Sequence, residues 1–470
     1  MTRAELLAGW STAHDVLELL RRFGKGSVQE TRPYPRTDAE RSARGRLVER
    51  IRAALAGARL RGEPSLLSHE LVELHRLAEE ALDTQPSLAA ACDLLLTAFD
   101  EGLGRILWKA FATRRDVHTL VKGDVFPIGT HPELMRLLDV RHLSERPESQ
   151  RSIYDQRQYV DVLRHEFDIT VAIDYSAGPA PLSKFLETRA VAVALPNDSV
   201  KEFECDIDPE ARTFFGVRVR DLESQARRIH ELLRAADKGG IPVVLLPELS
   251  TTAALSKGVG PLLSSSEHLS VVVAGSHHEP VPKPAGTYGA NRCESFLLGR
   301  GRPAVHGKFS PYVMKKWPGA RLDAPVVEHI DARTRHITVH WSLGGWSFTT
   351  LVCKDFLDPE TSHVLDRVRP NLVFVVAFSD ETTAFWRGCE SLTGRNQSLT
   401  FVANFGGARA YAAIAGLPLP RRADEDQAAD RSPVRFRARD VRAPALLCLR
   451  FPPWGTENGG LEWNVFQVVD

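Results

Sequence analysis

Three residues with the chemistry for acyl transfer lie at or near the ends of apolar runs. Glu248 ends one such run, and Cys353 directly follows another, Phe348–Val352. Lys308 lies between them in the short motif His306–Tyr312. A thiol nucleophile, a carboxylate base and a cation for the developing oxyanion suffice for attack on an amide or nitrile carbon. We therefore predict that these three side chains meet in one catalytic pocket.

The surroundings of Cys353 suit a nucleophile. The run before it predicts a buried strand, and Asp358 and Pro359 after it predict a helix start, with Asp358 as the N-cap. A thiol on that turn lies at the carboxyl end of the strand. There the backbone N–H of Lys354 can face the oxygen of a reacting carbonyl. A lone cysteine after a strand is more often a small buried hydrophobe, so the prediction depends on the neighbouring motifs.

Glu248 and Lys308 each have a simpler alternative interpretation. A carboxylate at the end of an apolar strand is partly desolvated, which raises its pKa and makes it a better base. The alternative is a solvated strand-end or N-capping glutamate. An ammonium near the thiol favours thiolate and stabilises a tetrahedral intermediate, and the alternative is a surface lysine. Lys315 and Lys316 fall outside the motif and are expected to face solvent.

The order of these motifs resembles that of the nitrilase, or carbon–nitrogen hydrolase, superfamily. The resemblance covers about residues 188–407, roughly half of the chain. It rests on Leu246-Pro247-Glu248, Ala274–Glu279, Asn291–Gly301, His306-Gly307-Lys308, Val352–Asp355, Arg395-Asn396-Gln397 and Val402–Gly407. It implies a four-layer α-β-β-α sandwich and hydrolysis of a non-peptide C–N bond through a Glu-Lys-Cys triad and a thioester. It also implies that the chain needs no cofactor or metal and forms a homo-oligomer.

The chain departs from the family pattern at two places. Many members carry a second glutamate soon after the lysine, but Phe309–Ala324 contains none, and Glu328 is the nearest candidate. Arg395 stands where a glutamate is common before Asn396. The resemblance implies that Arg395, Asn396 and Asn404 support the site rather than react. These departures leave open the substrate and whether the site turns over.

Composition bounds the class of protein. With 470 residues the chain exceeds one usual core and predicts two domains. Its hydrophobic (43%) and charged (26%) fractions are typical of soluble globular proteins, and its formal net charge of zero implies neither nucleic acid nor a membrane surface as a partner. No apolar run reaches the roughly 20 residues of a membrane span, and the N-terminal segment does not have the pattern of a signal peptide. Six scattered cysteines without a Cys-x-x-Cys pair predict a cytoplasmic protein with neither a zinc site nor a disulfide framework.

The two halves of the chain differ in periodicity. Residues 1–165 show helical spacing and no catalytic motif, so we expect a helical domain for assembly, sensing or partner binding. Residues 183–470 alternate strands and helices, which predicts an α/β domain. Its expected strands are Ala190–Leu195, Ile241–Leu246, His336–Trp341, Trp346–Val352, Leu372–Ala377 and Ser398–Asn404, and its expected helices are Leu222–Ala236 and Thr361–Val368. A polar loop is expected between Leu195 and Leu222.

Other functions remain open at this point. A Cys–His pair formed with His277, His278, His306 or His363 is a rival site, although the base position is already taken by Glu248. Metal binding by His277 and His278 is disfavoured because adjacent strand residues point to opposite faces. The chain is expected to act on a small amide or nitrile. The alternatives are a catalytically weak or inactive nitrilase-fold binding or regulatory module, or an effector gated by the N-terminal helices in a conflict or defence system.

Overall fold

The computed structural model describes fourteen stretches of the chain, and the account below concerns these residues. They are residues 38–61, 67–84, 88–129, 159–163, 166–177, 180–197, 199–283, 286–317, 322–342, 346–405, 410–416, 435–438, 441–450 and 464–467. The first part of the expected helical domain, residues 1–37, lies outside them. None of the described helices is long and apolar enough to cross a bilayer.

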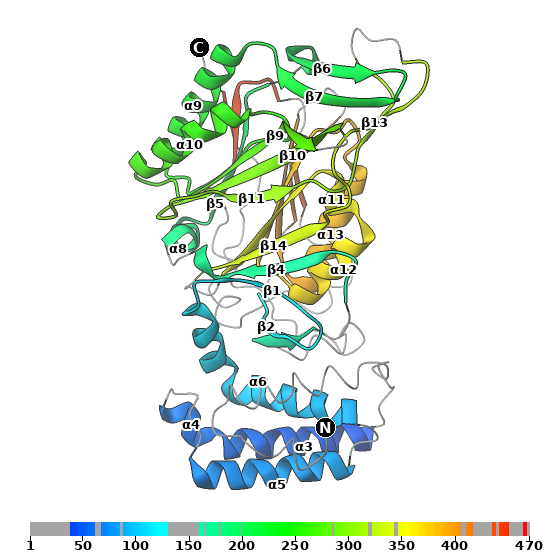
Figure 1. Ribbon diagram of the computed structural model, residues 1–470. Helices are drawn as coiled ribbons and strands as arrows, with labels where there is room; N and C mark the ends of the chain where they lie inside the picture. Colours follow the sequence, from blue (N-terminus) through cyan, green and yellow to red (C-terminus); the bar gives the residue numbers. More distant parts are fainter. Residues whose placement is uncertain are drawn as a thin grey trace.

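Four helices form the part of the structure nearest the N-terminus. They are α3 (Asp38–Ala54), α4 (Ala56–Arg61), α5 (Ser68–Thr84) and α6 (Leu88–Ala112). Their apolar faces meet in a separate cluster that includes Ile51, Leu74, Leu77, Leu94 and Phe99. The far end of α6 reaches the sheets, where Trp108 packs edge-on against Trp341 with ring centroids 5.3 Å apart. Figure 1 shows α3–α5 at the end of the molecule opposite β6 and β7.

Two large sheets form the body of the protein. One has the order β1 (Val117–Thr119), β4 (Thr170–Asp174), β14 (His336–Trp341), β15 (Ser347–Val352), β16 (Leu372–Ala377), β17 (Leu399–Asn404), β18 (Ala413–Gly416) and β19 (Arg435–Ala438). The other has the order β11 (Ala304–Gly307), β10 (Gly286–Leu297), β9 (Val271–Lys283), β8 (Val243–Leu245), β5 (Ala190–Leu195), β20 (Ala445–Arg450) and β21 (Asn464–Gln467).

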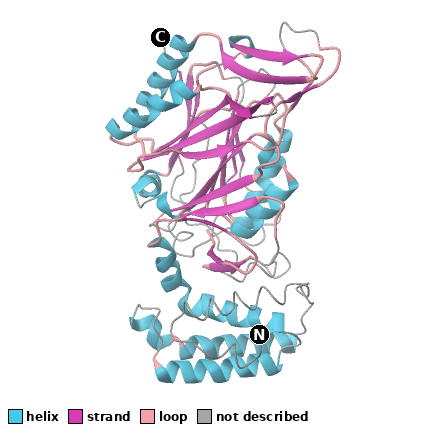
Figure 2. Cartoon of the chain, viewed as in Figure 1, coloured by secondary structure: helices cyan, strands magenta, loops and turns pink. Residues whose placement is uncertain are grey.

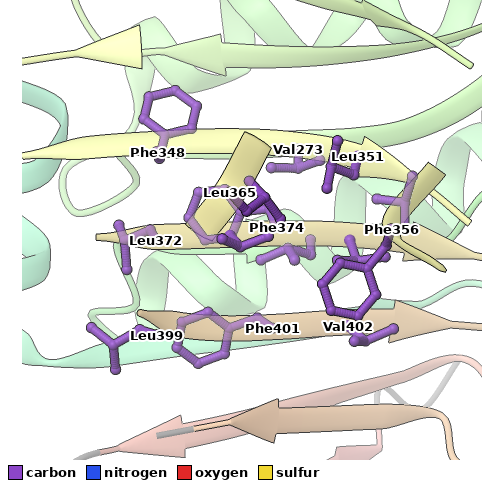
Figure 3. Packing of buried hydrophobic residues seen from close by; sticks show 14 of the residues in the cluster. Val273, Phe348, Leu351, Phe356, Leu365, Leu372, Phe374, Leu399, Phe401 and Val402 are labelled. Atoms are coloured by element: carbon purple, nitrogen blue, oxygen red, sulfur yellow. The ribbon is translucent and has the colours of Figure 1, made fainter. Parts of the chain in front are cut away.

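Alternation along the strands divides the apolar side chains between two clusters. In β5, Val191 and Val193 join the main core, whereas Ala192 and Ala194 face a second cluster with Leu232 of α9 (Leu222–Lys238). Successive side chains of a strand point to opposite faces of the sheet, so a strand covered on both faces is apolar at every position. Figure 3 shows the main core around β15, β16 and β17, where Phe348, Phe374 and Phe401 lie on neighbouring strands.

Helices cover both large sheets. The helices α9 and α10 (Ala253–Ser265) contact the seven-stranded sheet, and α11 (Lys354–Leu357) and α13 (Thr383–Asn396) contact the eight-stranded sheet. The helix α12 (Pro359–Val368) contacts both α11 and α13. Asp358 caps α12 through the backbone N–H of Glu360, as its sequence predicts. The remaining helical segments are α8 (Ala180–Thr188) and the 3-10 turns η5 (Tyr175–Ala177) and η6 (Val200–Glu202). Figure 2 shows the strands between helices on either flank, a mixed α/β architecture.

A small third sheet lies beside the strand ends. Its order is β12 (Val313–Met314), β13 (Val326–Glu328), β7 (Thr213–Val219) and β6 (Phe203–Asp208). The prediction of a polar loop between Leu195 and Leu222 is therefore wrong, because β6 and β7 form a hairpin there. Charged residues on the exposed face of β6 hide the strand in the sequence, while Phe203 on the other face is buried.

The helical interpretation of residues 1–165 is also wrong at its C-terminal end. Helix α6 ends at Ala112, and the strands β1, β2 (Val125–Pro127) and β3 (Val160–Val162) follow within that range. The intervening segment contains Gly123 with φ of 93° and the helix-breaking Pro127, so it lacks the continuity a helix needs. Strand β1 pairs with β4 and so belongs to the eight-stranded sheet.

Candidate active site

Cys353 lies on a strained turn at the carboxyl end of β15. Strands β15, β16 and β17 are parallel, so their carboxyl ends meet at one edge of the sheet. Cys353 has φ of 49° and ψ of −110°, outside the conformations that non-glycine residues ordinarily adopt. Its backbone N–H donates to the carbonyl of Val376 in the next strand at 2.7 Å. The turn into α11 is therefore held by the sheet in a conformation of a kind found at active sites.

Lys308 is buried between two carboxylates. Its Nζ donates to Oε1 of Glu248 at 2.8 Å and to Oε2 of Glu328 at 2.7 Å. All three side chains are almost fully buried. Asn291 strengthens the group, because its Nδ2 lies 3.0 Å from Oε1 of Glu248 and 2.9 Å from Oε1 of Glu328. A charge this deep in a protein persists only with such partners.

Glu328 is the most heavily hydrogen-bonded member of this group. Besides Lys308 and Asn291, the backbone N–H of Tyr312 donates to it at 3.0 Å and Nε2 of His278 lies 3.0 Å away. Burial opposes ionisation, but the charge of Lys308 and the hydrogen bond from His278 outweigh it and lower the pKa of Glu328. Glu328 is therefore an ionised anchor, since its lone pairs are occupied by donors.

The histidines near this group do not pair with the thiol. Nδ1 of His278 accepts from the backbone N–H of Val217 at 3.1 Å, so the proton of the neutral ring is on Nε2, which faces Glu328. Nε2 of His306 lies 2.8 Å from Oδ2 of Asp355. Within the described ranges, no three His, Cys, Asp or Glu side chains are placed to hold a metal ion.

The thiol of Cys353 lies against the Glu248 carboxylate in a nearly dry environment. Burial raises the pKa of Cys353 well above its ordinary value, and the charge of Glu248 adds to this. The two side chains are close enough to shift each other's pKa, and the backbone N–H of Phe378 acts to lower the pKa of the thiol. Burial likewise raises the pKa of Glu248. The resting pair is thus a protonated thiol beside a carboxylate of increased basicity.

Burial also opposes the charge on Lys308, but the negative charges of Glu248 and Glu328 outweigh it and raise the pKa of the lysine. Lys308 is therefore a permanent cation in this site.

Asp355 has a role that motif analysis missed. It is fully buried and accepts from the backbone N–H of Ser310 at 2.8 Å and of Phe309 at 3.2 Å, as well as pairing with His306. The side chain of Lys354 reaches the same loop, donating to the carbonyl of Pro311 at 3.1 Å. The aspartate was visible in the motif after Cys353, but its partners lie more than 40 residues earlier in the chain.

The three residues expected to support the site fall in two places. Asn404 ends β17 and holds the loop after β16, because it exchanges hydrogen bonds of 2.9 Å with the backbone of Ser379. Asn396 and Arg395 instead bind Asp366 of α12 at 3.0 and 2.9 Å. They precede β17, so the six residues of the strand separate them from the Cys353 edge by about 20 Å. The structure does not bring Arg395 and Asn396 to the candidate site.

A cavity of about 350 Å³ opens onto the buried carboxylates and lysine. It is lined by Val200, Phe214, Val217, Glu248, Leu249, Lys308, Tyr312, Met314, Lys316, Trp317, Glu328, Phe378, Ser379, Asp380 and Phe405. Lys316, which was expected simply to face solvent, is exposed and also lines this cavity. Cys353 itself is 2% exposed and is not among the residues that line this cavity.

Comparison with known proteins returns structural likeness only. No protein-family model and no curated protein sequence matches the chain. Among solved structures, it is similar to a cysteine-to-alanine mutant of the Nesterenkonia AN1 amidase from the nitrilase superfamily. That match has 16% identity and a TM-score of 0.36, and covers 56% of this chain and 90% of the amidase. Saccharomyces cerevisiae Nit3, a member of branch 10 of that superfamily, matches at 14% identity and a TM-score of 0.32, covering 49% of this chain and 84% of its own. Likeness at this level carries no argument about the superfamily or the activity of this chain.

Proposed function

We propose that the protein is a carbon–nitrogen hydrolase that cleaves an amide or nitrile through a Glu248-Lys308-Cys353 triad. The observation that carries the proposal is the buried Lys308 ammonium, held between Glu248 and Glu328 and in contact with a carboxylate whose charge acts on the Cys353 thiol. Building this arrangement has a large desolvation cost, which a purely structural lysine does not require. The proposed scaffold is a four-layer α-β-β-α sandwich.

In the proposed reaction on an amide, Glu248 takes the proton from Cys353 as the sulfur attacks the carbonyl carbon. The Lys308 ammonium and the backbone N–H of Lys354 hold the resulting oxyanion. The C–N bond then breaks, and the departing amine takes the proton from Glu248. Glu248 next removes a proton from water, which attacks the thioester, and the acid leaves as the thiol is restored. Glu328 fixes Lys308 in place and does not transfer a proton.

One observation favours a second candidate, an inactive nitrilase-fold binding or regulatory module. Cys353 is 2% exposed and does not line the cavity, so a substrate reaches the sulfur only after a local rearrangement. Such a module binds amides but does not release ammonia. The homo-oligomer, the cytoplasmic location and a protein partner for the N-terminal helices remain proposals of the same standing.

The test combines labelling and turnover. Iodoacetamide, followed by peptide mass spectrometry, should modify Cys353 faster than the more exposed Cys205, because in the proposed mechanism Glu248 takes the proton of Cys353 as the sulfur reacts. A panel of primary amides and nitriles is then assayed for ammonia. Release by the wild type and none by Cys353→Ala supports the hydrolase. Binding of the panel without release by either protein supports the binding module.

A further inference from the structure

The cavity beside the candidate site has a polar floor and apolar walls. Glu248, Lys308 and Glu328 form the floor. The walls are eight apolar side chains: Val200, Phe214, Val217, Leu249, Met314, Trp317, Phe378 and Phe405. Several of them belong to one apolar cluster under the small sheet. The β6–β7 hairpin, which the sequence hides as a polar segment, thus contributes directly to the shape of the cavity.

The wall nearest the sulfur is aromatic and packed from behind. The rings of Phe378 and Phe405 lie 4.6 Å apart between centroids, and Phe203 packs edge-on against both at 5.1 and 5.7 Å. Such edge-on packing restrains the rings. Phe378 directly follows β16, whose carboxyl end lies beside that of β15, so this apolar wall begins on the strand next to Cys353.

The floor offers no counter-charge to a charged ligand. Lys308 already pairs with two carboxylates, and the described donors on Glu328 occupy its oxygens. An anionic group inside would meet one cation and two carboxylates, and a cationic group could pair only with the base that the reaction uses. The remaining charged lining residues, Lys316 and Asp380, are exposed, where an ion pair contributes little.

The cavity size limits the ligand. Since a water molecule takes about 30 Å³ in the liquid, a volume of about 350 Å³ corresponds to about a dozen non-hydrogen atoms. This is at the small end of ligand sites, and it suits a compact chain or a single ring with its amide group.

We propose that the substrate is an uncharged amide with an apolar acyl group of up to about ten carbon atoms. This inference rests on the proposed hydrolase function, because it places the carbonyl at Cys353. The acyl part is assigned to the cavity because it stays attached to sulfur in the thioester while the amine leaves. Once the local rearrangement brings the carbonyl to the sulfur, the apolar wall of the cavity retains that group through both steps of the reaction.

The test is a series of straight-chain primary amides from acetamide to decanamide, with phenylacetamide and the anionic succinamate added. Ammonia release gives kcat/KM for the wild type, and calorimetry gives binding of the same amides to Cys353→Ala. We expect kcat/KM to rise about fourfold per added methylene until the cavity is full. Succinamate should be a poor substrate because its carboxylate is desolvated without a partner.

Two variants of the cavity wall and a matched control test whether the chain-length preference arises in the cavity. Met314→Trp fills the cavity and should shorten the preferred chain, whereas Phe214→Ala enlarges it and should lengthen the preferred chain. Val313→Thr is the control, because Val313 adjoins Met314 in β12 but is exposed on the opposite face. If Met314→Trp does not fold, the chain-length preference of Phe214→Ala alone tests whether the acyl group lies in the cavity.

Each outcome separates this inference from the hydrolase proposal. Hydrolysis that is fastest with acetamide or succinamate, or a chain preference unmoved by the folded wall variants, overturns the substrate class and leaves the hydrolase intact. Chain-length-dependent binding to Cys353→Ala without ammonia release by the wild type supports the apolar site and overturns the hydrolase. Absence of both binding and hydrolysis across the series overturns the substrate class.

Discussion

Asp355 accepts a hydrogen bond from the backbone N–H of Ser310 at 2.8 Å and so joins the turn after Cys353 to the loop after Lys308. The nucleophile and the cation come from different large sheets, on β15 and just after β11. Their separation is therefore not fixed by any single strand pairing. The buried Asp355 carboxylate provides the cross-connection, which makes it a positioning residue in the proposed mechanism.

We predict that Asp355→Asn lowers kcat about 10- to 100-fold with little change in KM. The amide loses a charge-assisted hydrogen bond of about 1.5–3 kcal/mol, so the lysine loop shifts relative to the sulfur. KM changes little because Asp355 does not line the cavity. Steady-state kinetics on any amide the wild type hydrolyses provides the measurement.

Asp366→Asn is the matched control for this prediction. Asp366 binds Arg395 and Asn396 at the opposite edge of the sheet, so its loss should leave kcat unchanged. A drop in kcat with Asp366→Asn equal to that with Asp355→Asn would show that general loosening of the fold, rather than positioning of Lys308, explains both.

Cys353→Ala should abolish hydrolysis while the protein keeps its fold. The side chain is buried but small, so truncation leaves a minor cavity, and the loss is chemical. Cys353→Ser should also be nearly inactive, because Glu248 is poorly matched to an alcohol whose pKa is far above that of a thiol. Ammonia release and circular dichroism check both variants. Wild-type turnover by folded Cys353→Ala would refute the mechanism.

Glu328→Gln should move the acid limb of the pH–rate profile to lower pH. Glu248 must be ionised to accept a proton, so kcat/KM falls as pH falls through its raised pKa. Burial is the largest cause of that raised pKa, and the charge of Glu328 adds to it. Removing this charge lowers the pKa of Glu248, while the lost anchor for Lys308 lowers kcat about 10- to 100-fold.

Glu279→Gln, a change at a partly exposed residue, is the control for the pH profile, since Glu279 pairs with Arg292 rather than Lys308. It should leave the acid limb in place. An acid limb that moves to higher pH in Glu328→Gln would mean that Glu248 is not the group whose titration limits the rate.

Sequence periodicity predicted the buried strands well. The strand over Leu372–Ala377 was predicted with the same bounds as β16, because a parallel strand covered on both faces reads as an unbroken apolar run. Glu328 was identified as a candidate only by its order after Lys308. No local pattern shows that its carboxylate turns inward, since that depends on donors from β9, β10 and the lysine loop.

The cavity walls and the connecting aspartate could not be predicted in the same way. Met314 lies on a strand of two residues, and Phe214 lies on β7, whose hairpin partner β6 is rich in acidic residues. Asp355 depends on a contact with a segment more than 40 residues away. Conversely, Arg395 and Asn396 were assigned to the site by motif order, although they precede a parallel strand whose far end is at the site.

Lys308→Met should destabilise the protein as well as inactivate it. It leaves Glu248 and Glu328 buried together without a cation, which costs about 3–5 kcal/mol of unfolding free energy. Glu328 has a lowered pKa in the folded state, so its contribution is present above the unfolded value of 4.5 and is lost as pH falls towards the folded value. Because Lys308 is one cause of that shift, the difference between wild type and variant should be largest near neutral pH and shrink in acid.

Urea unfolding at several pH values gives the measurement for Lys308→Met, and Lys316→Met is its control. Lys316 is exposed, and loss of its charge should change the unfolding free energy by less than about 1 kcal/mol. A Lys308→Met protein as stable as the wild type at neutral pH would show that the two glutamates are not both ionised in the folded state.

The last prediction concerns the division of labour between the N-terminal helices and the sheets. A fragment beginning near Ser183 is a poor test, because it removes β4, which pairs with β14 inside the eight-stranded sheet.

The substitution Ile51→Asp is a sharper test, since Ile51 is fully buried in the helical cluster and an unpaired carboxylate there should unfold that cluster. The sheets have their own core, so they should stay folded in the Ile51→Asp protein. That protein should therefore keep selective iodoacetamide labelling of Cys353 while its assembly state changes. Arg52→Asp on the exposed side of α3 is the control and should alter neither property. Loss of selective Cys353 labelling in Ile51→Asp with an unchanged assembly state would show that the helices act on the site itself.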